Sequence, residues 1–348
     1  MIRIGDLFDR IVSMDNLREA AKKACSTRKN RTEVQEFLED SENNLKKLRD
    51  SLIDGTYKSS EYRMFNILER GKQRFVADLP LNPDRILHWA ICLVAEEPLN
   101  NKLIDQSYGS RPGMGYHDAV KKVHSYIQKD AKIRYALIVD VKKFFASIDK
   151  EILKKKMLRV FKDRRFLDLM FKLIDEYSYP GIPIGNRYSP MLANLYLSDM
   201  DHKLKERHHV HYLVSFMDDR CILGYSKKWL RRILGIIKDE LSAIGLELKG
   251  NYQIFPIDSR GIPFLGYRIF SDHILLKKPT KKRMKGSVKR ISNRQSKDPD
   301  YRLDDRDLGV LNSYSGVLKH CDGKHLRSVT IVPVLIEDRR REKKGATE

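Results

Sequence analysis

The feature that most constrains this chain is a pair of adjacent aspartates, Asp218 and Asp219, set between two β-prone apolar runs. The runs cover residues 214–217 and 221–223. Two such runs around a short polar step predict a tight hairpin that holds both carboxylates at its turn. Carboxylates crowded in this way repel each other unless a hard cation lies between them.

A second acid follows an apolar run far upstream. The segment Tyr135–Asp140 reads as a buried strand that ends in a carboxylate. One acid after a buried strand, together with an acid pair on a distant hairpin, is the layout of a two-metal site for phosphoryl transfer. Asp149 has a different interpretation, because Ser147–Lys150 looks like the start of a helix that either Ser147 or Asp149 caps.

Four motifs, taken in their order and spacing, resemble those of the reverse transcriptases over residues 60 to 275. The motifs are Asp140–Phe145 for Asp-x-x-x-Phe-Phe, Gly185–Pro190 for Gly-x-x-x-Ser-Pro, Phe216–Asp219 in place of Tyr-x-Asp-Asp, and Phe264–Tyr267 for Phe-Leu-Gly-Tyr. A single Asp-Asp pair has little specificity, whereas four ordered motifs are a specific signal.

The resemblance implies an α+β fold, a right-hand polymerase with fingers, a palm whose antiparallel sheet packs on helices, and a small helical thumb. Strand–helix alternation around an antiparallel hairpin agrees with this class. The expected division is an N-terminal helical extension (1–60), fingers (61–130), palm (131–272) and basic thumb (273–348). Periodicity and turn residues predict helices over 7–55, 83–104, 118–129 and 228–244, one more from Pro190, and strands over 62–68, 74–78 and 269–276.

Charge points to a polyanionic partner. The chain has 348 residues, 41% of them hydrophobic, with 68 Lys and Arg against 47 Asp and Glu, a net charge of +21. Nine of the basic residues and no acid fall in 277–294, which predicts a nucleic-acid contact on the thumb through Lys281, Lys282, Arg283 and Lys285. The segments 304–307 and 340–348 look solvated and loosely held.

The resemblance assigns the catalytic acids. Asp140, Asp218 and Asp219 would hold two Mg²⁺ ions with the help of the Val141 carbonyl, and Asp219 would be the less essential acid. Hard ions of this size prefer oxygen ligands, and Mn²⁺ is the expected substitute for Mg²⁺.

The resemblance also names nucleotide contacts. Phe145 would lie beneath the nucleotide sugar and exclude a 2′-hydroxyl, so that the product is DNA, whereas Phe144 would be the core residue because successive strand residues face opposite ways. Lys72 and Arg74 would clamp the triphosphate, and a solvated charged hairpin is the alternative. Gly185 would let the backbone approach the nucleotide and template, and Lys249 would protonate pyrophosphate or be a plain surface lysine.

Template and primer contacts are expected at three further places. Arg111, in a Gly- and Pro-rich loop, is a candidate contact to the template or triphosphate. Ser189 and Pro190 end the glycine loop beside the template. A primer-gripping hairpin is expected at Phe264, Leu265, Gly266 and Tyr267.

Subgroup and role stay open. Ile184 before Gly185 is similar to the enzymes of diversity-generating retroelements, but those enzymes follow the loop serine with Gln, where this chain has Pro190. We therefore favour copying of a cognate noncoding RNA into DNA from dNTPs, in antiphage defence, with mutagenic cDNA synthesis as the alternative. An accessory protein or a second copy of the chain is left open as a partner.

Other classes are weighed against the polymerase. Phe145 argues against an RNA polymerase, the three acids argue against a non-catalytic RNA-binding scaffold, and the basic thumb argues against a nucleotide cyclase. The N-terminal residues show no signal sequence, and no apolar run approaches the roughly 18 residues of a membrane span. The expected location is cytoplasmic, with no membrane partner.

Overall fold

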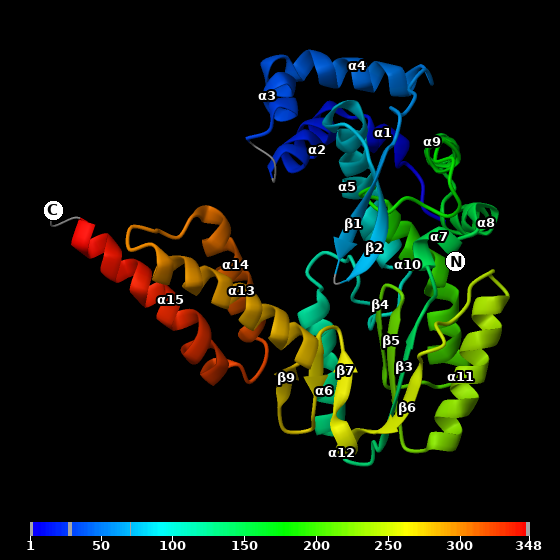
Figure 1. Ribbon diagram of the computed structural model, residues 1–348. Helices are drawn as coiled ribbons and strands as arrows, with labels where there is room; N and C mark the ends of the chain where they lie inside the picture. Colours follow the sequence, from blue (N-terminus) through cyan, green and yellow to red (C-terminus); the bar gives the residue numbers. More distant parts are fainter. Residues whose placement is uncertain (1–2, 27–29, 70, 346–348) are drawn as a thin grey trace. The chain divides into compact units, whose positions relative to one another are not determined.

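The computed structural model describes residues 3–26, 30–69 and 71–345 and has the expected α+β class (Figure 1). The helices are α1 (Phe8–Ile11), α2 (Met14–Ser26), α3 (Thr32–Glu39), α4 (Ser41–Ile53), α5 (Ile86–Asn100), α6 (Tyr116–Lys129), α7 (Phe144–Ser147), α8 (Lys150–Val160), α9 (Arg164–Asp175), α10 (Ser189–His202), α11 (Lys227–Ser242), α12 (Ile257–Arg260), α13 (Lys278–Lys297), α14 (Asp305–Leu318) and α15 (Lys324–Gly345). Two single π-helical turns, η1 (Leu81–Arg85) and η2 (Lys203–Arg207), adjoin α5 and α10.

The strands form three small sheets. They are β1 (Arg63–Glu69), β2 (Lys72–Asp78), β3 (Tyr135–Asp140), β4 (Leu213–Phe216), β5 (Asp219–Gly224), β6 (Gln253–Pro256), β7 (Ile262–Phe264), β8 (Tyr267–Ile269) and β9 (Ile274–Leu276). The strand orders are β1-β2, β4-β5-β3-β6 and β7-β8-β9. The central order places β5, which begins at Asp219, beside β3, which ends in Asp140.

The chain forms two compact units. The first comprises Met1–Gly115, Val139–Arg220 and Arg231–Tyr252, and the second comprises Tyr116–Ile138, Cys221–Leu230 and Gln253–Glu348. The four-part division expected from sequence stays a prediction. Within the described residues, no helix combines the length and the apolarity that crossing a membrane requires.

The predicted finger hairpin is present, with β1 shifted by one residue and β2 starting two residues earlier than expected. Glu69 pairs with Lys72, so that Lys72 begins β2 and is not part of a loop. The side chain of Lys72 lies outside the described residues. Arg74 is exposed and pairs with Ile67 across the hairpin. Directly opposite residues share a face of an antiparallel pair, so Arg74 and Ile67 present the same face of the hairpin.

Helix α10 is the centre of the first unit's core. It starts at Ser189 with Pro190 in its first turn, a position where proline has no hydrogen bond to lose. Apolar side chains recur at helical spacing from α10 into η2, and each is at most 2% exposed: Leu192, Tyr196, Met200 and Leu204. This stripe is therefore core.

Two aspartates fix the helices that flank this core. Asp149 caps α8, as predicted, by accepting a hydrogen bond of 2.9 Å from the Ile152 amide. Asp163 caps α9 and also accepts hydrogen bonds from the amides of Leu7 and Phe8, at 2.7 and 2.8 Å. A single carboxylate thus ties the N-terminal segment to α9.

The region expected to be the thumb corrects one expectation. Asp304, Asp305 and Arg306 are exposed as expected, but Asp307 is 3% exposed and pairs with Arg294 and Tyr301, while Asp304 caps α14. The chain after Arg339 is helical, because α15 continues to Gly345, and its loose attachment stays a prediction. Short-range sequence patterns missed the burial of Asp307, since the partners that cover it lie on other segments.

The hairpin formed by β7 and β8, followed by β9, precedes helices α13 to α15. Leu265 and Gly266 connect β7 to β8, and both have positive φ, 44° and 89°. Positive φ at both central residues is the conformation of a tight two-residue hairpin turn, which favours glycine. The single strand expected over 269–276 is two strands, β8 and β9, paired antiparallel.

Candidate active site

The acid pair lies on the predicted hairpin between β4 and β5. Met217 and Asp218 form the turn, and Asp219 is the first residue of β5. Met217 has a φ of 53°, in the left-handed region that a non-glycine residue adopts only when its surroundings hold it there. The side chain of Asp218 is therefore displayed at the tip of the turn rather than along a strand.

A buried arginine holds this turn, and sequence reasoning missed it. Arg220 is 2% exposed and pairs with both carboxylate oxygens of Asp201 on α10, at 3.1 and 3.0 Å. It also donates a hydrogen bond of 2.5 Å to the carbonyl of Met217. Two parallel bonds to a carboxylate fix a guanidinium in both position and plane. Arg220 therefore connects the turn that carries Asp218 to the core helix α10.

The glycine-rich loop before α6 also packs against the turn that carries Asp218. Ser215 in β4 exchanges backbone hydrogen bonds of 2.9 Å with Gln106 and Tyr108. Gly109 then passes so close to Met217 that a Cβ atom there would lie 2.6 Å from the Met217 nitrogen. The side-chain amide of Asn194 on α10 donates to the Gly109 carbonyl at 2.7 Å. Glycine is required at 109 because the hairpin turn packs directly on its backbone.

Arg111 belongs to this loop and has a structural partner set. Its guanidinium donates to the carbonyls of Ile104 and Ser107, at 3.1 and 2.8 Å. Burial lowers the pKa of Arg111. These bonds close the loop on itself, and the expected template contact of Arg111 stays a prediction.

Asp140 ends β3, and a short backbone ladder places Lys249 beside it. Val141 forms a bridge with Leu248, and the Lys249 amide donates to the Asp140 carbonyl at 2.8 Å. This register brings the Lys249 ammonium into contact with Oδ2 of Asp140 as an ion pair. The sequence offered Lys249 either as a proton donor to pyrophosphate or as a surface lysine, and the ladder shows how its ammonium reaches Asp140.

Asp140 and Asp218 face each other. Burial, followed by the charge of Asp140 and a hydrogen bond between the two carboxyl groups, raises the pKa of Asp218 to about 6. The other oxygen of Asp140, Oδ1, is buried and has no hydrogen-bond partner. Crowded carboxylates with an unsatisfied buried oxygen are the donor set that a hard divalent cation would satisfy. These two residues therefore fit a Mg²⁺ ion.

The third acid does not complete a cluster. Asp219 is half-buried at the start of β5. Across residues 3–26, 30–69 and 71–345, no group of three or more His, Cys, Asp and Glu side chains is arranged to hold a metal ion. The structure thus brings together two of the three expected carboxylates. Asp219 and the Val141 carbonyl stay predictions as ligands.

Phe145 is half-buried, and Phe144 is the core residue, 3% exposed. The core position of Phe144 was predicted for the wrong reason, because both residues lie in helix α7 and not in a strand, and the role of Phe145 at the nucleotide sugar stays a prediction. Lys143, with a φ of 46°, turns the chain between Asp140 and this helix. The Ile182 amide donates to the Phe145 carbonyl at 3.0 Å and fixes its backbone.

The glycine loop before α10 packs against the finger hairpin. Gly185 has a φ of 130°, and a Cβ atom there would overlap the carbonyl of Ala77 in β2. The Ala77 amide donates to the Ile184 carbonyl at 2.8 Å. The close approach that requires glycine at 185 is therefore to β2, which is a packing role that the sequence did not reveal. Ser189, next along, is buried with an unpartnered hydroxyl, and Pro190 is half-buried.

Arg187 fixes the same loop to helix α5. Its guanidinium stacks on the ring of Trp89, 4.5 Å from the centroid, and pairs with Glu96 at 2.9 Å. Both partners lie on α5, which the sequence predicted as a helix without a role in the site. The side chain of Asn186 donates to the Tyr62 hydroxyl at 2.8 Å. The loop is thus fixed at both ends before any substrate binds.

The predicted primer and thumb contacts belong to the second unit. Phe264 and Tyr267 are at most 2% exposed, so their side chains form core, and only the turn at Leu265 and Gly266 is accessible. The four basic thumb residues, Lys281, Lys282, Arg283 and Lys285, are exposed in the first half of α13. A helix with an exposed basic stripe is a suitable surface for a phosphate backbone.

The sequence of the region that contains this site matches a known protein family. The sequence profile of the family described as "Reverse transcriptase (RNA-dependent DNA polymerase)" matches residues 59–269. That range contains the hairpin acids, Asp140, Phe145, the glycine loop and Lys249.

Curated relatives share this central part of the chain. Protein YkfC of Escherichia coli is 27% identical over 172 residues, which are 46% of this chain and 45% of YkfC. The group II intron-encoded protein LtrA of Lactococcus lactis is 28% identical over 171 residues, 46% of this chain and 28% of LtrA. A putative COX1/OXI3 intron 1 protein of Saccharomyces cerevisiae is 30% identical over 177 residues, 47% and 20% of the two chains. The chain spans less than half the length of these relatives.

Solved structures of telomerase show a weaker likeness. Apo telomerase from Candida tropicalis, truncated from its C-terminal domain, aligns with a TM-score of 0.47 at 15% identity and covers 62% of this chain and 55% of the telomerase. Telomerase from Candida albicans in complex with a telomeric RNA fragment gives 0.47 at 10% identity, covering 65% and 48%. Scores of this size do not by themselves establish a common fold.

Proposed function

We propose that this chain, which belongs to the reverse transcriptase family, is an RNA-directed DNA polymerase whose reaction depends on Asp140 and Asp218. The observation that carries the proposal is their pairing, in which burial and the charge of Asp140 raise the pKa of Asp218 to about 6. Neighbouring carboxylates with perturbed pKa values mark sites that hold a cation or move a proton. A non-catalytic RNA-binding scaffold has no need of such a costly arrangement.

The carboxylate pair would hold divalent ions. Mg²⁺ bound at Asp140 and Asp218, with Asp219 and the Val141 carbonyl as further ligands, supplies charge stabilisation to the attacking and leaving oxygens of nucleotidyl transfer. The protein's own task is to keep the two carboxylates at fixed positions. Arg220 does this for the hairpin turn through its bonds to Asp201 and Met217.

The neighbouring side chains would select and orient the nucleotide. Phe145 would block a 2′-hydroxyl, since its ring is the half-buried one of the aromatic pair on α7. Arg74 and Lys72 of the finger hairpin would bind the triphosphate. Lys249, whose ammonium contacts Asp140, would donate a proton to the leaving pyrophosphate.

Template and primer would contact further segments of the chain. The loop from Gly185 to Pro190 is held rigidly by β2 and α5, which supports a role in positioning the template strand. The turn at Leu265 and Gly266 would grip the primer backbone. The exposed basic residues of α13 would follow the nucleic acid, in line with the net charge of +21.

For the biological role we favour copying of a cognate noncoding RNA in antiphage defence, with mutagenic cDNA synthesis as the alternative. The support is in the loop sequence, where Ile184 favours the diversity-generating group and Pro190 disfavours it. The role is tested by sequencing nucleic acid that copurifies with the protein from its native operon and by challenging cells with phage. Defence that requires Asp218 and one enriched RNA supports the role; adenine-scattered cDNA with no effect on phage plating contradicts it.

The polymerase activity itself is tested by primer extension. The full chain is given a primed RNA template, Mg²⁺, and either dNTPs or rNTPs. The proposal predicts extension with dNTPs and none with Asp218→Ala. Extension only with rNTPs would replace it by an RNA polymerase, and no extension under any Mg²⁺ or Mn²⁺ condition, with RNA binding intact, would favour a scaffold.

A further inference from the structure

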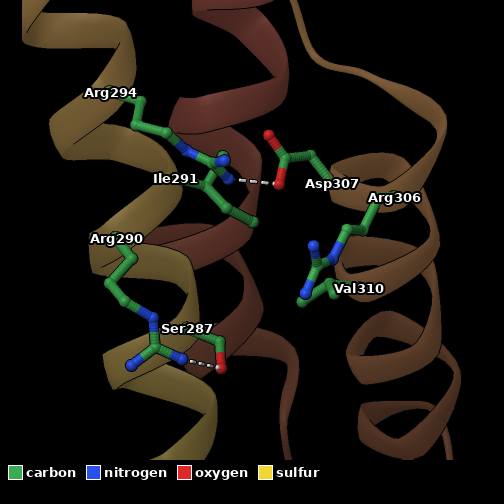
Figure 2. A pocket seen from close by; sticks show the side chains of 7 residues that line it. All are labelled: Ser287, Arg290, Ile291, Arg294, Arg306, Asp307 and Val310. Atoms are coloured by element: carbon green, nitrogen blue, oxygen red, sulfur yellow. Dashed lines mark hydrogen bonds and ion pairs between the residues drawn. The ribbon is translucent and has the colours of Figure 1, made fainter.

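Helices α13 and α14 of the thumb enclose a cavity of about 440 Å³ (Figure 2). Its wall combines three arginines with two aliphatic side chains. The lining residues are Ser287, Arg290, Ile291, Arg294, Arg306, Asp307 and Val310. All of them belong to the second unit, so the cavity is described within one compact body.

The cavity carries more positive charge than its own acid can balance. Asp307 is the carboxylate among its lining residues, and this group already pairs with Arg294 and accepts a hydrogen bond from the Tyr301 hydroxyl. Arg290 donates to the Ser287 hydroxyl at 3.1 Å, a neutral partner that does not compensate its charge. Figure 2 shows Arg306 reaching from α14 into the space between the helices. Two guanidinium groups are thus available to an anion.

The other part of the wall is apolar. Ile291 is 3% exposed and lies on α13, and Val310 is half-buried on α14. A cavity of this volume is in the range of sites that take small organic molecules and has far more space than one water-sized group needs. The occupant should therefore carry a phosphate together with a flat or apolar portion.

We infer that this cavity receives one nucleotide of an unpaired RNA segment, with its phosphate on Arg290 and Arg306 and its sugar and base against Ile291 and Val310. Guanidinium forks match phosphate oxygens, and unpaired RNA bases are recognised when they are splayed out onto aliphatic, aromatic or guanidinium surfaces. The inference rests on the proposed function, because it assumes an RNA partner. The proposed cavity site would recognise a single strand, whereas the exposed lysines of α13 would contact phosphates alone.

The test compares binding of a short unstructured RNA and of an RNA duplex of equal length to the full chain, by fluorescence anisotropy over a range of salt. Arg306→Gln should weaken binding of the single strand and reduce the magnitude of its log–log salt slope by about 0.7, the value for one phosphate that is no longer neutralised. Val310→Phe fills the apolar part without a change of charge. It should weaken single-strand binding, leave the salt slope unchanged and spare the duplex.

Arg327→Gln is the matched control, because it removes the same charge from an exposed position on α15 that does not line the cavity. It should leave the preference for single strand over duplex unchanged. Wild-type behaviour of Val310→Phe, or equal weakening for both RNAs, would overturn the inference. Thermal unfolding of each variant separates impaired binding from impaired folding.

Two further measurements are needed. One distinguishes RNA from a free nucleotide as the ligand of the cavity, and the other distinguishes the cavity proposal from the polymerase proposal. If adenosine monophosphate displaces the single strand, the cavity binds free nucleotides and the assignment to RNA is overturned; failure to displace it supports RNA. Primer extension is measured on the same preparations. A wild-type chain that binds single strands through Val310 but makes no DNA would contradict the polymerase and leave the cavity assignment intact.

Discussion

Single residues at the catalytic centre have to hold like charges at close range. Asp140 and Asp218 are brought together by two unrelated segments, and neither would be stable there without groups that oppose the repulsion. Lys249 supplies a positive charge to Asp140, and Arg220 fixes the turn that carries Asp218. The two carboxylates are thus held in place by contacts within the protein before a substrate binds.

The buried Arg220–Asp201 pair makes the first prediction at this scale. Arg220→Met leaves Asp201 buried without this partner, so the free energy of unfolding in urea should fall by about 3–5 kcal/mol. The double variant Arg220→Met with Asp201→Leu should recover most of that loss, because no charge is left buried. A single variant as stable as the wild type would show that the pair does not hold the turn.

Phe145 makes the second prediction. Phe145→Val removes bulk where the nucleotide sugar is proposed to lie, so incorporation of ribonucleotides should rise relative to deoxynucleotides. Single-nucleotide incorporation with matched dNTP and rNTP measures the ratio, and Phe144→Leu is the control because Phe144 is core. A wild-type enzyme that already uses both sugars equally would remove the steric explanation.

Single residues also show where sequence reasoning reaches its limit. The acids were identifiable because their motifs are local and ordered. Arg220 was not, because an arginine after two aspartates looks like part of a solvated turn until Asp201, on a different element, is known to face it. Gly185 was correctly marked as a close approach, but its partner, the Ala77 carbonyl, depends on tertiary packing.

At the scale of elements, the site depends on helices and loops that are fixed to one another by backbone contacts. The segment 106–109 pairs with β4, the segment 247–249 pairs with the end of β3, and the loop before α10 bonds to β2. Most helices and hairpins were predictable from periodicity and turn residues. The burial of Asp307 was not, because it depends on Arg294 and Tyr301 on neighbouring segments.

Asp163 makes a prediction about pH at this scale. Burial acts to raise its pKa, but hydrogen bonds from the amides of Phe8, Phe166 and Leu7 outweigh burial and lower it. A carboxylate with a lowered pKa stabilises the fold above its unfolded pKa of about 3.9, and this contribution disappears as the pH falls through the folded value.

Asp163→Ala should therefore lower stability by about 1–2 kcal/mol at neutral pH, as expected when a helix cap is removed. The difference from the wild type should shrink in acid, below about pH 4. Urea unfolding across pH measures it, with Asp168→Ala, an exposed acid on the same helix, as the control. A difference that is constant over the whole pH range would contradict the role of the carboxylate.

For the whole molecule, the dominant property is charge. A net charge of +21 favours fast, salt-sensitive association with nucleic acid. Replacement of Lys281, Lys282, Arg283 and Lys285 by glutamine should weaken RNA binding and flatten its salt dependence, by roughly 0.7–0.9 in log–log slope for each phosphate that the variant no longer neutralises. An unchanged slope in anisotropy titrations would show that this stripe of α13 does not touch the RNA.

The central claim is that Asp140 and Asp218 form the catalytic pair of an RNA-directed DNA polymerase. The most direct measurement is primer extension on an RNA template with Mg²⁺, using Asp140→Ala, Asp218→Ala and, as a matched control, Asp149→Ala, which removes a helix-capping acid outside the pair. The account predicts that both pair variants lose incorporation while retaining RNA affinity and folding, and that Asp149→Ala still extends the primer. Extension by Asp140→Ala at the wild-type rate would contradict it.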